Sequence, residues 1–220
     1  MTKAQKKNRI AQIVALLEER YPEALCALEY EGEPWKLLVM ARLSAQCTDA
    51  RVNLVSRELF AAYPTLSSLA DAPIESIEDL VRPCGLFRTK AKSIKEACIL
   101  LRDKYNGQVP DTMEELLSLP GVGRKIANLM LGDIYGKPAI VADTHCIRIC
   151  GRFGMYPTSL KDPTKVEKIL VELVEPEKQS DFCHRIVLFG RDICSARAPR
   201  CDSCPLRELC DFGGAKTGKK

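Results

Sequence analysis

Two glycines interrupt a helical part of the chain in the sequence Leu119-Pro-Gly-Val-Gly-Arg-Lys125. Glycine permits a positive φ and the close approach of another backbone, so this sequence predicts a tight turn between two helices. The amides of such a turn and of the next helix start converge, and they can bind an anion such as a phosphate group. An ordinary connection between antiparallel helices uses the same glycines, but Arg124 and Lys125 follow them directly and favour phosphate binding. No base edge is reached in this way, so the contact would not depend on nucleotide sequence.

Lys125 lies in the first turn of the predicted second helix, and Asp143 lies at the start of a later helix. An ordinary lysine is an ammonium ion at neutral pH and is not a nucleophile, but the same residue type can contact phosphate. Lys125 is therefore either a phosphate contact or a nucleophile. Asp143 is either a helix cap or the partner of that nucleophile. As a pair, the amine and the carboxylate would suit attack at a sugar carbon, with the carboxylate relaying protons or stabilising a cationic sugar.

The segments on either side of the turn are also predicted to be helical, because their apolar residues recur at helical spacing between prolines and glycines. Thr112-Met-Glu-Glu115 has the pattern of a capping box and predicts the start of the helix before the turn. No alternating apolar pattern indicates a sheet, so the predicted class is all-α. Residues 211–220 contain three glycines and three lysines and are predicted to form a mobile tail. Of the other predicted helices, the first ends before Tyr21 and the second begins at Pro34. The rest span 49–62, 65–70, 74–82, 88–105, 143–153, 163–174 and 181–193.

Composition limits the kind of protein. The 220 residues are 46% hydrophobic, enough for a buried core in one large or two small domains. No apolar run reaches the length of a membrane span, and the basic N-terminus is not followed by an apolar stretch, so we expect a cytoplasmic protein without a secretion signal. The net charge is +4, and basic residues gather at 82–104 and after residue 184, which favours a polyanionic partner. Solvated helix faces are the simpler explanation of the charge pattern taken alone.

Four of the eleven cysteines form a cluster near the C-terminus, with gaps of six, two and five residues. Four thiolates in so short a segment predict a closed metal site, and a single Cys-x-x-Cys favours a [4Fe–4S] cluster over zinc. The loop between the first two cysteines carries Arg197 and Arg200, which would suit phosphate contact. The scattered cysteines are predicted to be small core residues. The predicted metal ligands are Cys194, Cys201, Cys204 and Cys210.

These motifs, together with Leu43-Ser-Ala-Gln-Cys-Thr-Asp49 and Gly85-Leu-Phe-Arg-Thr-Lys90, resemble the endonuclease III family of DNA glycosylases. The resemblance extends over essentially the whole chain. It implies two all-α domains with a DNA cleft between them. A six-helix barrel would span 27–137, with a helix–hairpin–helix motif at about 112–136. Residues 1–26 and 138–220 would form an iron–sulfur domain, with the cluster loop at 194–210.

The resemblance also implies roles for individual residues. Lys125 matches the catalytic lysine that attacks C1′ of the damaged nucleotide, and Asp143 matches the catalytic aspartate. From the pattern alone, Gln46 is a polar residue on a helix surface and Leu86 a core leucine. The resemblance implies instead that Gln46 fills the gap left by a flipped base and that Leu86 wedges into the opposite strand. The further DNA contacts that we predict are Gly121, Gly123, Arg124, Arg197 and Arg200.

The expected function is base excision repair by a bifunctional DNA glycosylase and AP lyase. Such an enzyme, acting as a monomer, would remove oxidised or ring-saturated pyrimidines from double-stranded DNA and nick abasic sites through a lysine Schiff base. One alternative is a monofunctional mismatch glycosylase, and another is a non-catalytic helix–hairpin–helix DNA-binding module. The joint presence of Lys125 and Asp143 argues against both. Three positions, Ile126, Gly151 and Ala198, depart from the common family pattern.

Overall fold

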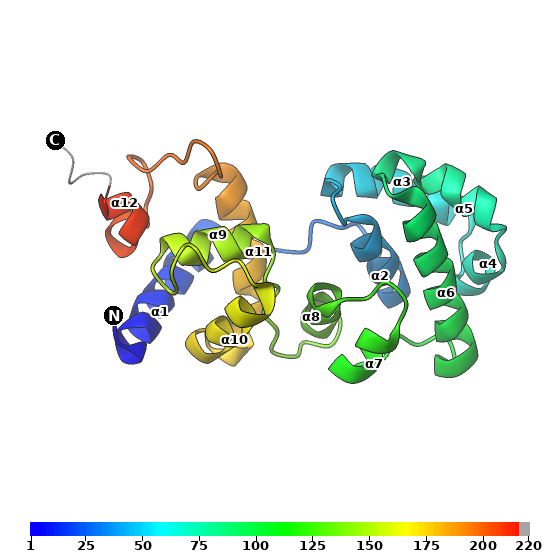
Figure 1. Cartoon of the computed structure of the whole chain (residues 1–220), viewed down its shortest axis with the longest axis horizontal. Helices are drawn as coiled ribbons and strands as arrows, with labels where there is room; N and C mark the ends of the chain where they lie inside the picture. Colours follow the sequence, from blue (N-terminus) through cyan, green and yellow to red (C-terminus); the bar gives the residue numbers. More distant parts are fainter. Residues whose placement is uncertain (216–220) are drawn as a thin grey trace. The chain divides into compact units, whose positions relative to one another are not determined.

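The computed structural model describes residues 1–215, and every regular element within that range is a helix (Figure 1). The all-α prediction is therefore confirmed. The chain forms two compact units, a central unit (Cys26–Tyr135) and a terminal unit (Met1–Leu25 with Gly136–Lys220). None of the described helices combines the length and the apolarity that a membrane span requires.

The central unit is built around α6 (Phe87–Tyr105), the longest of its helices, which contacts α2, α4 and α5 (Figure 1). Buried residues recur every three or four positions along α6, so one face of this helix points into the core. Nearly every side chain of α2 is buried, as the wide apolar band of its sequence predicts. The other helices are α2 (Pro34–Leu43), α3 (Asp49–Ala62), α4 (Leu66–Asp71), α5 (Ile74–Val81), the 3-10 helix η1 (Arg82–Cys84), α7 (Met113–Ser118) and α8 (Arg124–Asp133).

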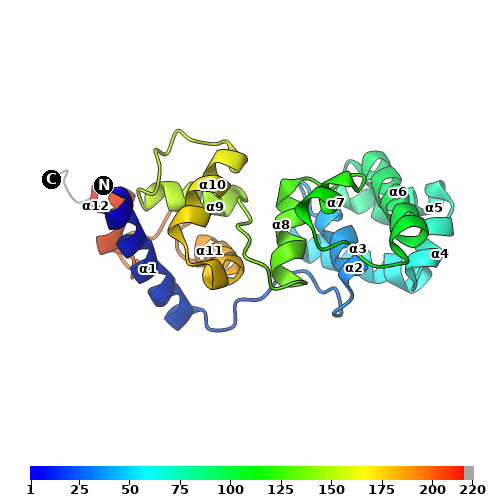
Figure 2. The ribbon, with the colours of Figure 1, turned by 90° about the horizontal axis from the view of Figure 1, so that it is seen from below.

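The terminal unit joins the two ends of the chain. Its first helix, α1, packs against α10 and α11, which lie far along the sequence (Figure 2). Ile10, Ile13 and Leu17 on one face of α1 enter a core shared with Phe182 and Phe189 of α11. The helices of this unit are α1 (Lys3–Arg20), α9 (Thr144–Arg152), α10 (Pro163–Leu173), η2 (Pro176–Lys178), α11 (Gln179–Asp192), η3 (Arg207–Leu209) and α12 (Asp211–Ala215).

The predicted mobile tail is wrong for residues 211–215, which form α12. Asp211 accepts a hydrogen bond from Arg9 at 2.5 Å, and the Phe212 ring lies 4.6 Å from the guanidinium carbon of Arg152. Glycines and lysines in the sequence predict mobility, but these tertiary contacts hold the segment on α1 and α9. Residues 216–220 of the predicted tail lie outside the described residues.

Gly190 allows α11 to approach α9. A Cβ added there would lie 2.4 Å from His145 Nδ1 and 2.8 Å from Ile149 Cδ1. A Cβ added at Gly151 of α9 would meet its nearest neighbour, Tyr156 Cε2, at 3.3 Å. We expect Gly190→Ala to have a free energy of unfolding about 1–3 kcal/mol lower than that of Gly151→Ala, because the former forces side chains apart by much more than the few tenths of an ångström that the latter needs. Both variants gain the same helix propensity, so the difference between their free energies of unfolding in urea reports the steric overlap at position 190. Equal stabilities would contradict the packing described.

Candidate functional site

The predicted turn lies between α7 and α8. Thr112 Oγ1 accepts a hydrogen bond from the Glu115 amide at 3.3 Å, which is one half of the predicted capping box. The Glu115 carboxylate accepts from the Thr112 hydroxyl at 2.7 Å, and not from the Thr112 amide as a full capping box requires. The Val122 amide donates to Leu119 O at 3.1 Å, and both of these side chains are buried. The buried pair anchors the turn, whereas its two glycines are exposed. Gly123 is the N-cap residue of α8, and it offers no side-chain cap to the N-terminal amides of that helix.

The two glycines of the turn have different roles. Gly121 has a φ of +76°, and a Cβ there would lie 2.6 Å from Arg42 Nε and 2.8 Å from Ser93 Oγ. Gly123 has a φ of −100°, and a Cβ there would meet no atom within 4 Å. The packing of the central unit therefore requires glycine at 121. At 123 the space beside the backbone is open, which permits close approach of a second molecule.

Lys125 is exposed in the first turn of α8, directly after this open backbone. No hydrogen bond or ion pair with another described residue holds its ammonium group. Arg124 is also exposed. Two cations next to uncapped amides make a strongly positive helix terminus. Both roles predicted for Lys125, phosphate contact and nucleophile, fit this position.

Asp143 caps α9. Its Oδ1 accepts a hydrogen bond from the Cys146 amide at 2.7 Å, so the capping role considered from the sequence is present. Cys146, Ile149 and Cys150 on the same helix are buried, which fixes the helix and therefore its half-buried capping carboxylate. Asp143 belongs to the terminal unit and Lys125 to the central unit, and their joint catalytic role stays a prediction.

Gln46 and Leu86 are two of the four non-glycine residues with positive φ in the described chain, at +56° and +48°. Gln46 is exposed in the turn between α2 and α3, and not on a helix surface as its pattern alone predicts. Leu86 is 59% exposed, so its interpretation as a core leucine is wrong. A left-handed conformation costs roughly 1–3 kcal/mol for such residues, and strain of this kind gathers at functional sites.

Sequence reasoning missed Lys90, which binds the backbone shortly before each of these residues. Its side chain is fully buried, and its Nζ donates to Leu43 O and Cys84 O, each at 2.8 Å. The available signal was a lysine on the apolar face of a predicted amphipathic helix. Such a residue is almost never buried unless its charge has partners.

The four clustered cysteines line one small cavity of about 20 Å³, together with Phe153, Phe189 and Phe212. Backbone bonds fold the segment into successive turns: the Cys204 amide donates to Cys201 O at 3.3 Å, and the Cys210 amide donates to Arg207 O at 3.1 Å. All four thiols are free of disulfides. Within the part of the chain that the structure describes, no group of three or more His, Cys, Asp or Glu side chains is arranged to hold a metal ion.

Arg152 organises the start of this cysteine loop, and no sequence pattern singled it out. Its buried guanidinium donates to Cys194 Sγ at 3.1 Å, to Ser195 O at 2.8 Å and to Ala196 O at 2.9 Å. Arg148 adds a bond to Cys194 O at 3.0 Å. The first predicted ligand is therefore fixed by α9, the helix that Asp143 caps.

The two arginines of the loop differ. Both are exposed, but Arg200 pairs with Asp192 at 2.5 Å, whereas no described residue pairs with Arg197. Asp192 also accepts bonds from Arg20 and Tyr21, and these two donors, with the Arg20 bond the larger cause, hold the pKa of Asp192 below its usual value. Arg200 is thus drawn back onto α11, and DNA contact by either arginine stays a prediction.

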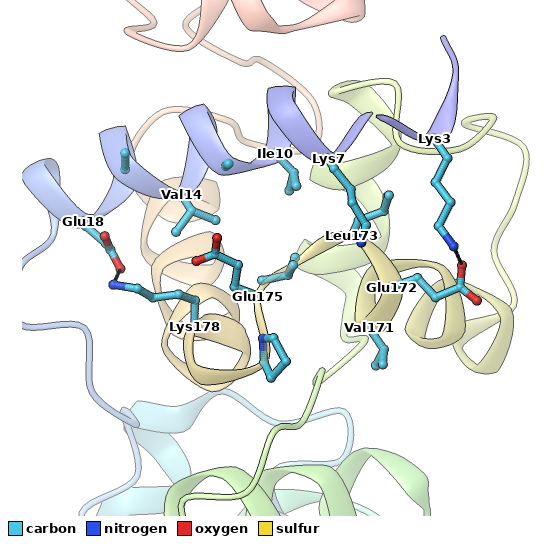
Figure 3. A pocket seen from close by; sticks show the side chains of 14 residues that line it. Lys3, Lys7, Ile10, Val14, Glu18, Val171, Glu172, Leu173, Glu175 and Lys178 are labelled. Atoms are coloured by element: carbon cyan, nitrogen blue, oxygen red, sulfur yellow. Dashed lines mark hydrogen bonds and ion pairs between the residues drawn. The ribbon is translucent and has the colours of Figure 1, made fainter. Parts of the chain in front are cut away.

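A separate cavity of about 610 Å³ lies along α1 (Figure 3). Ile10, Val14 and Leu173 supply apolar side chains to it, and ion pairs join Lys3 to Glu172 and Glu18 to Lys178 across it. None of the predicted catalytic, DNA-binding or metal-ligating residues lines this cavity.

Comparisons with known proteins agree with these features. Residues 39–176 match the family described as HhH-GPD superfamily base excision DNA repair protein. The chain is 43% identical to endonuclease III of Synechocystis sp. over 94% of both chains, and 35% identical to endonuclease III of Escherichia coli (strain K12) over 94% of this chain and 96% of that one. A solved non-covalent endonuclease III–DNA complex is similar with a TM-score of 0.90 and 41% identity over 100% of both chains. A trapped endonuclease III–DNA covalent intermediate gives 0.89 and 40% over 99% of both.

The contrast between the two turn glycines can be measured. We expect Gly121→Ala to lower the free energy of unfolding by about 1–3 kcal/mol, because alanine is strained at that φ and overlaps Arg42 and Ser93. Gly123→Ala should stay within about 0.5 kcal/mol of the wild type, since its Cβ meets open space. Chemical denaturation of the two variants tests the difference, and equal losses would show that the turn is packed differently.

Proposed function

The chain belongs to the endonuclease III family of the HhH-GPD superfamily of base excision DNA repair proteins, and from this premise we propose how its residues act. It is a DNA glycosylase and AP lyase of base excision repair that acts on double-stranded DNA. One observation carries the residue-level proposal: an exposed lysine, Lys125, directly follows an exposed glycine turn at an uncapped helix N-terminus. This arrangement brings an anion-binding backbone and an amine to the same point.

The hairpin binds the DNA backbone. The amides at the start of α8 donate to a phosphate, and the open space beside Gly123 lets the phosphate approach closely. Arg124 adds a cation at the same end of the helix. Such contacts position the strand but read no sequence, as is appropriate for a repair enzyme that must act wherever damage occurs.

Lys125 is the nucleophile and Asp143 its partner. The neutral amine attacks C1′, and the base leaves with the electrons of the C1′–N bond and takes up a proton. The sugar ring opens as an imine forms between C1′ and Lys125. Loss of a proton from C2′ then expels the 3′ phosphate, and water hydrolyses the imine. The carboxylate of Asp143 stabilises the cationic sugar and relays protons.

Gln46 and Leu86 give the amine access to C1′. The glycosidic carbon is shielded in a duplex, so the damaged nucleotide must leave the stack, at a cost of a few kcal/mol. Leu86, an exposed apolar side chain on a sharp turn, wedges into the opposite strand, and Gln46 fills the gap. Both fill space that would otherwise be empty and so offset part of that cost.

We infer that the damaged bases are oxidised or ring-saturated pyrimidines. A monofunctional mismatch glycosylase is the alternative, and a solved thymine-DNA glycosylase has the same fold with a TM-score of 0.85 at 22% identity. A monofunctional enzyme needs no amine nucleophile, so the presence of Lys125 favours the bifunctional reaction.

The cysteine loop holds a [4Fe–4S] cluster. Four soft thiolate donors around one aromatic-lined cavity fit such a group, and the Arg152 guanidinium is placed to stabilise the charge on the Cys194 sulfur. Cys194, Cys201, Cys204 and Cys210 would hold the cluster, and their shared attachment to it would cross-link the loop. The loop then presents Arg197 to a phosphate.

Borohydride trapping tests the chemistry. Wild-type protein mixed with duplex DNA containing thymine glycol or an abasic site should give a covalent complex, and Lys125→Gln should give none. Asp143→Asn should remove bases about 10²–10⁴-fold more slowly. Because Lys125 is exposed and asparagine caps helices as well as aspartate, both variants should unfold like the wild type.

The same assay separates the alternatives. Release of a base without a trapped complex would indicate a monofunctional glycosylase. Binding to DNA with neither base release nor trapping would indicate a DNA-binding module. A duplex with a G·T mismatch, run beside thymine glycol, shows which substrate class is preferred.

Metal analysis tests the cluster. We expect anaerobically purified protein to contain about four iron and four sulfide per chain, and Cys204→Ser to lose them. Stoichiometric zinc without iron in the wild type would overturn the cluster assignment.

A further inference from the structure

Lys90 is a fully buried lysine in the first turn of α6. Its ammonium donates to Leu43 O, at the end of α2, and to Cys84 O, in η1, at 2.8 Å each. A buried charge is unfavourable unless hydrogen bonds replace its water. The two carbonyls are therefore bound together by one cation, although they are far apart in the sequence.

Each carbonyl lies two or three residues before a residue with a strained backbone. Leu43 ends the helix before the turn that contains Gln46, and Cys84 precedes the turn that contains Leu86. Both of these residues have left-handed backbones, which persist only where the surroundings impose them. The two turns also lie close together, because the Cys47 thiol is a near neighbour of the Cys84 thiol. Burial, together with this neighbour, raises the pKa of Cys84 to about 11.

The same network reaches the hairpin. Ser93 lies one turn after Lys90 on α6, and its hydroxyl donates to Lys90 O at 3.0 Å. That hydroxyl accepts a bond from Arg42 Nε at 2.8 Å. Arg42 and Ser93 are the two residues against which Gly121 packs. One polar chain within the central unit thus connects the backbone-binding turn with the turns of Gln46 and Leu86.

We propose that Lys90 is a positioning residue for base flipping, which holds the Gln46 and Leu86 turns in register with each other and with the hairpin. Lys90 is buried and contacts no DNA; it acts through the two carbonyls. The proposal rests on the proposed function, since it requires that Gln46 and Leu86 enter the duplex.

The test removes the hydrogen-bond donors of Lys90 and keeps a side chain of similar length. Lys90→Met has no donor, and Lys90→Gln keeps an amide that can reach one carbonyl. The duplex carries a tetrahydrofuran abasic analogue with 2-aminopurine opposite, so that fluorescence reports the estranged base without chemistry. At saturating protein we expect Lys90→Met to give less than about half of the wild-type rise in emission, with Lys90→Gln between them. The salt dependence of binding, which reports the phosphate contacts of the hairpin, should be unchanged.

Turnover kinetics should also separate the positioning of the nucleotide from the binding of the strand. On thymine glycol DNA we expect kcat for Lys90→Met to fall about ten- to a hundredfold while KM changes little, because the strand is held but the nucleotide is misplaced. If Lys90→Met does not fold, Lys90→Gln decides the same comparison.

Lys36→Met is the matched control. Lys36 is 6% exposed in the same unit and pairs with Glu31 and Glu33 at the opposite end of α2. Its loss should lower thermal stability but leave the emission and kcat of the folded protein as in the wild type. Wild-type emission from folded Lys90→Met, or equal emission losses in both lysine variants, would overturn the proposal. A wild type that produces no emission change would instead overturn the proposed function.

Discussion

Every helix begins with amides that have no partner within the helix, and this constraint organises the functional residues. α7 and α9 satisfy it internally, since Thr112 and Asp143 accept hydrogen bonds from backbone amides. Gly123, the N-cap residue of α8, has no side chain to do the same. Under the proposed function, a phosphate would accept hydrogen bonds from these amides, and Lys125 beside them would reach the sugar. The anion site would then be a helix start without a side-chain cap.

Buried cations hold the loops around these helix ends. Lys90 joins two carbonyls in the central unit. In the terminal unit, Arg152 binds the first cysteine of the cysteine loop, and Arg185 donates to Tyr21 O at 3.1 Å. Each of these buried cations has lost its hydration water and donates hydrogen bonds to fixed protein acceptors in its place. Loops fixed in this way can carry strained or exposed residues such as Leu86 without collapsing onto the core.

Much of the helical layout could be predicted from the sequence, because prolines, glycines and caps mark helix ends locally. Helix α3 spans the predicted 49–62, and Thr112 caps α7. The same local signals failed where tertiary contacts decide: α12 forms despite its glycines, and Leu86 is exposed despite its apolar side chain. The position of Lys90 on an apolar helix face was a signal that it is buried, but its partners could not be predicted. Those partners, and most of the partners of Arg152, are backbone carbonyls, which are the same in every residue and leave no sequence pattern.

The terminal unit is assembled from both ends of the chain, with the central unit inserted between them. This has a consequence for biosynthesis. The apolar face of α1 leaves the ribosome before the central unit, and its partners on α11 leave only after that unit. The central unit can complete its own core in the interval. Ile10 and Leu17 stay uncovered until α11 has been made, so the nascent chain carries an exposed apolar helix face during that time, a surface of the kind that chaperones recognise.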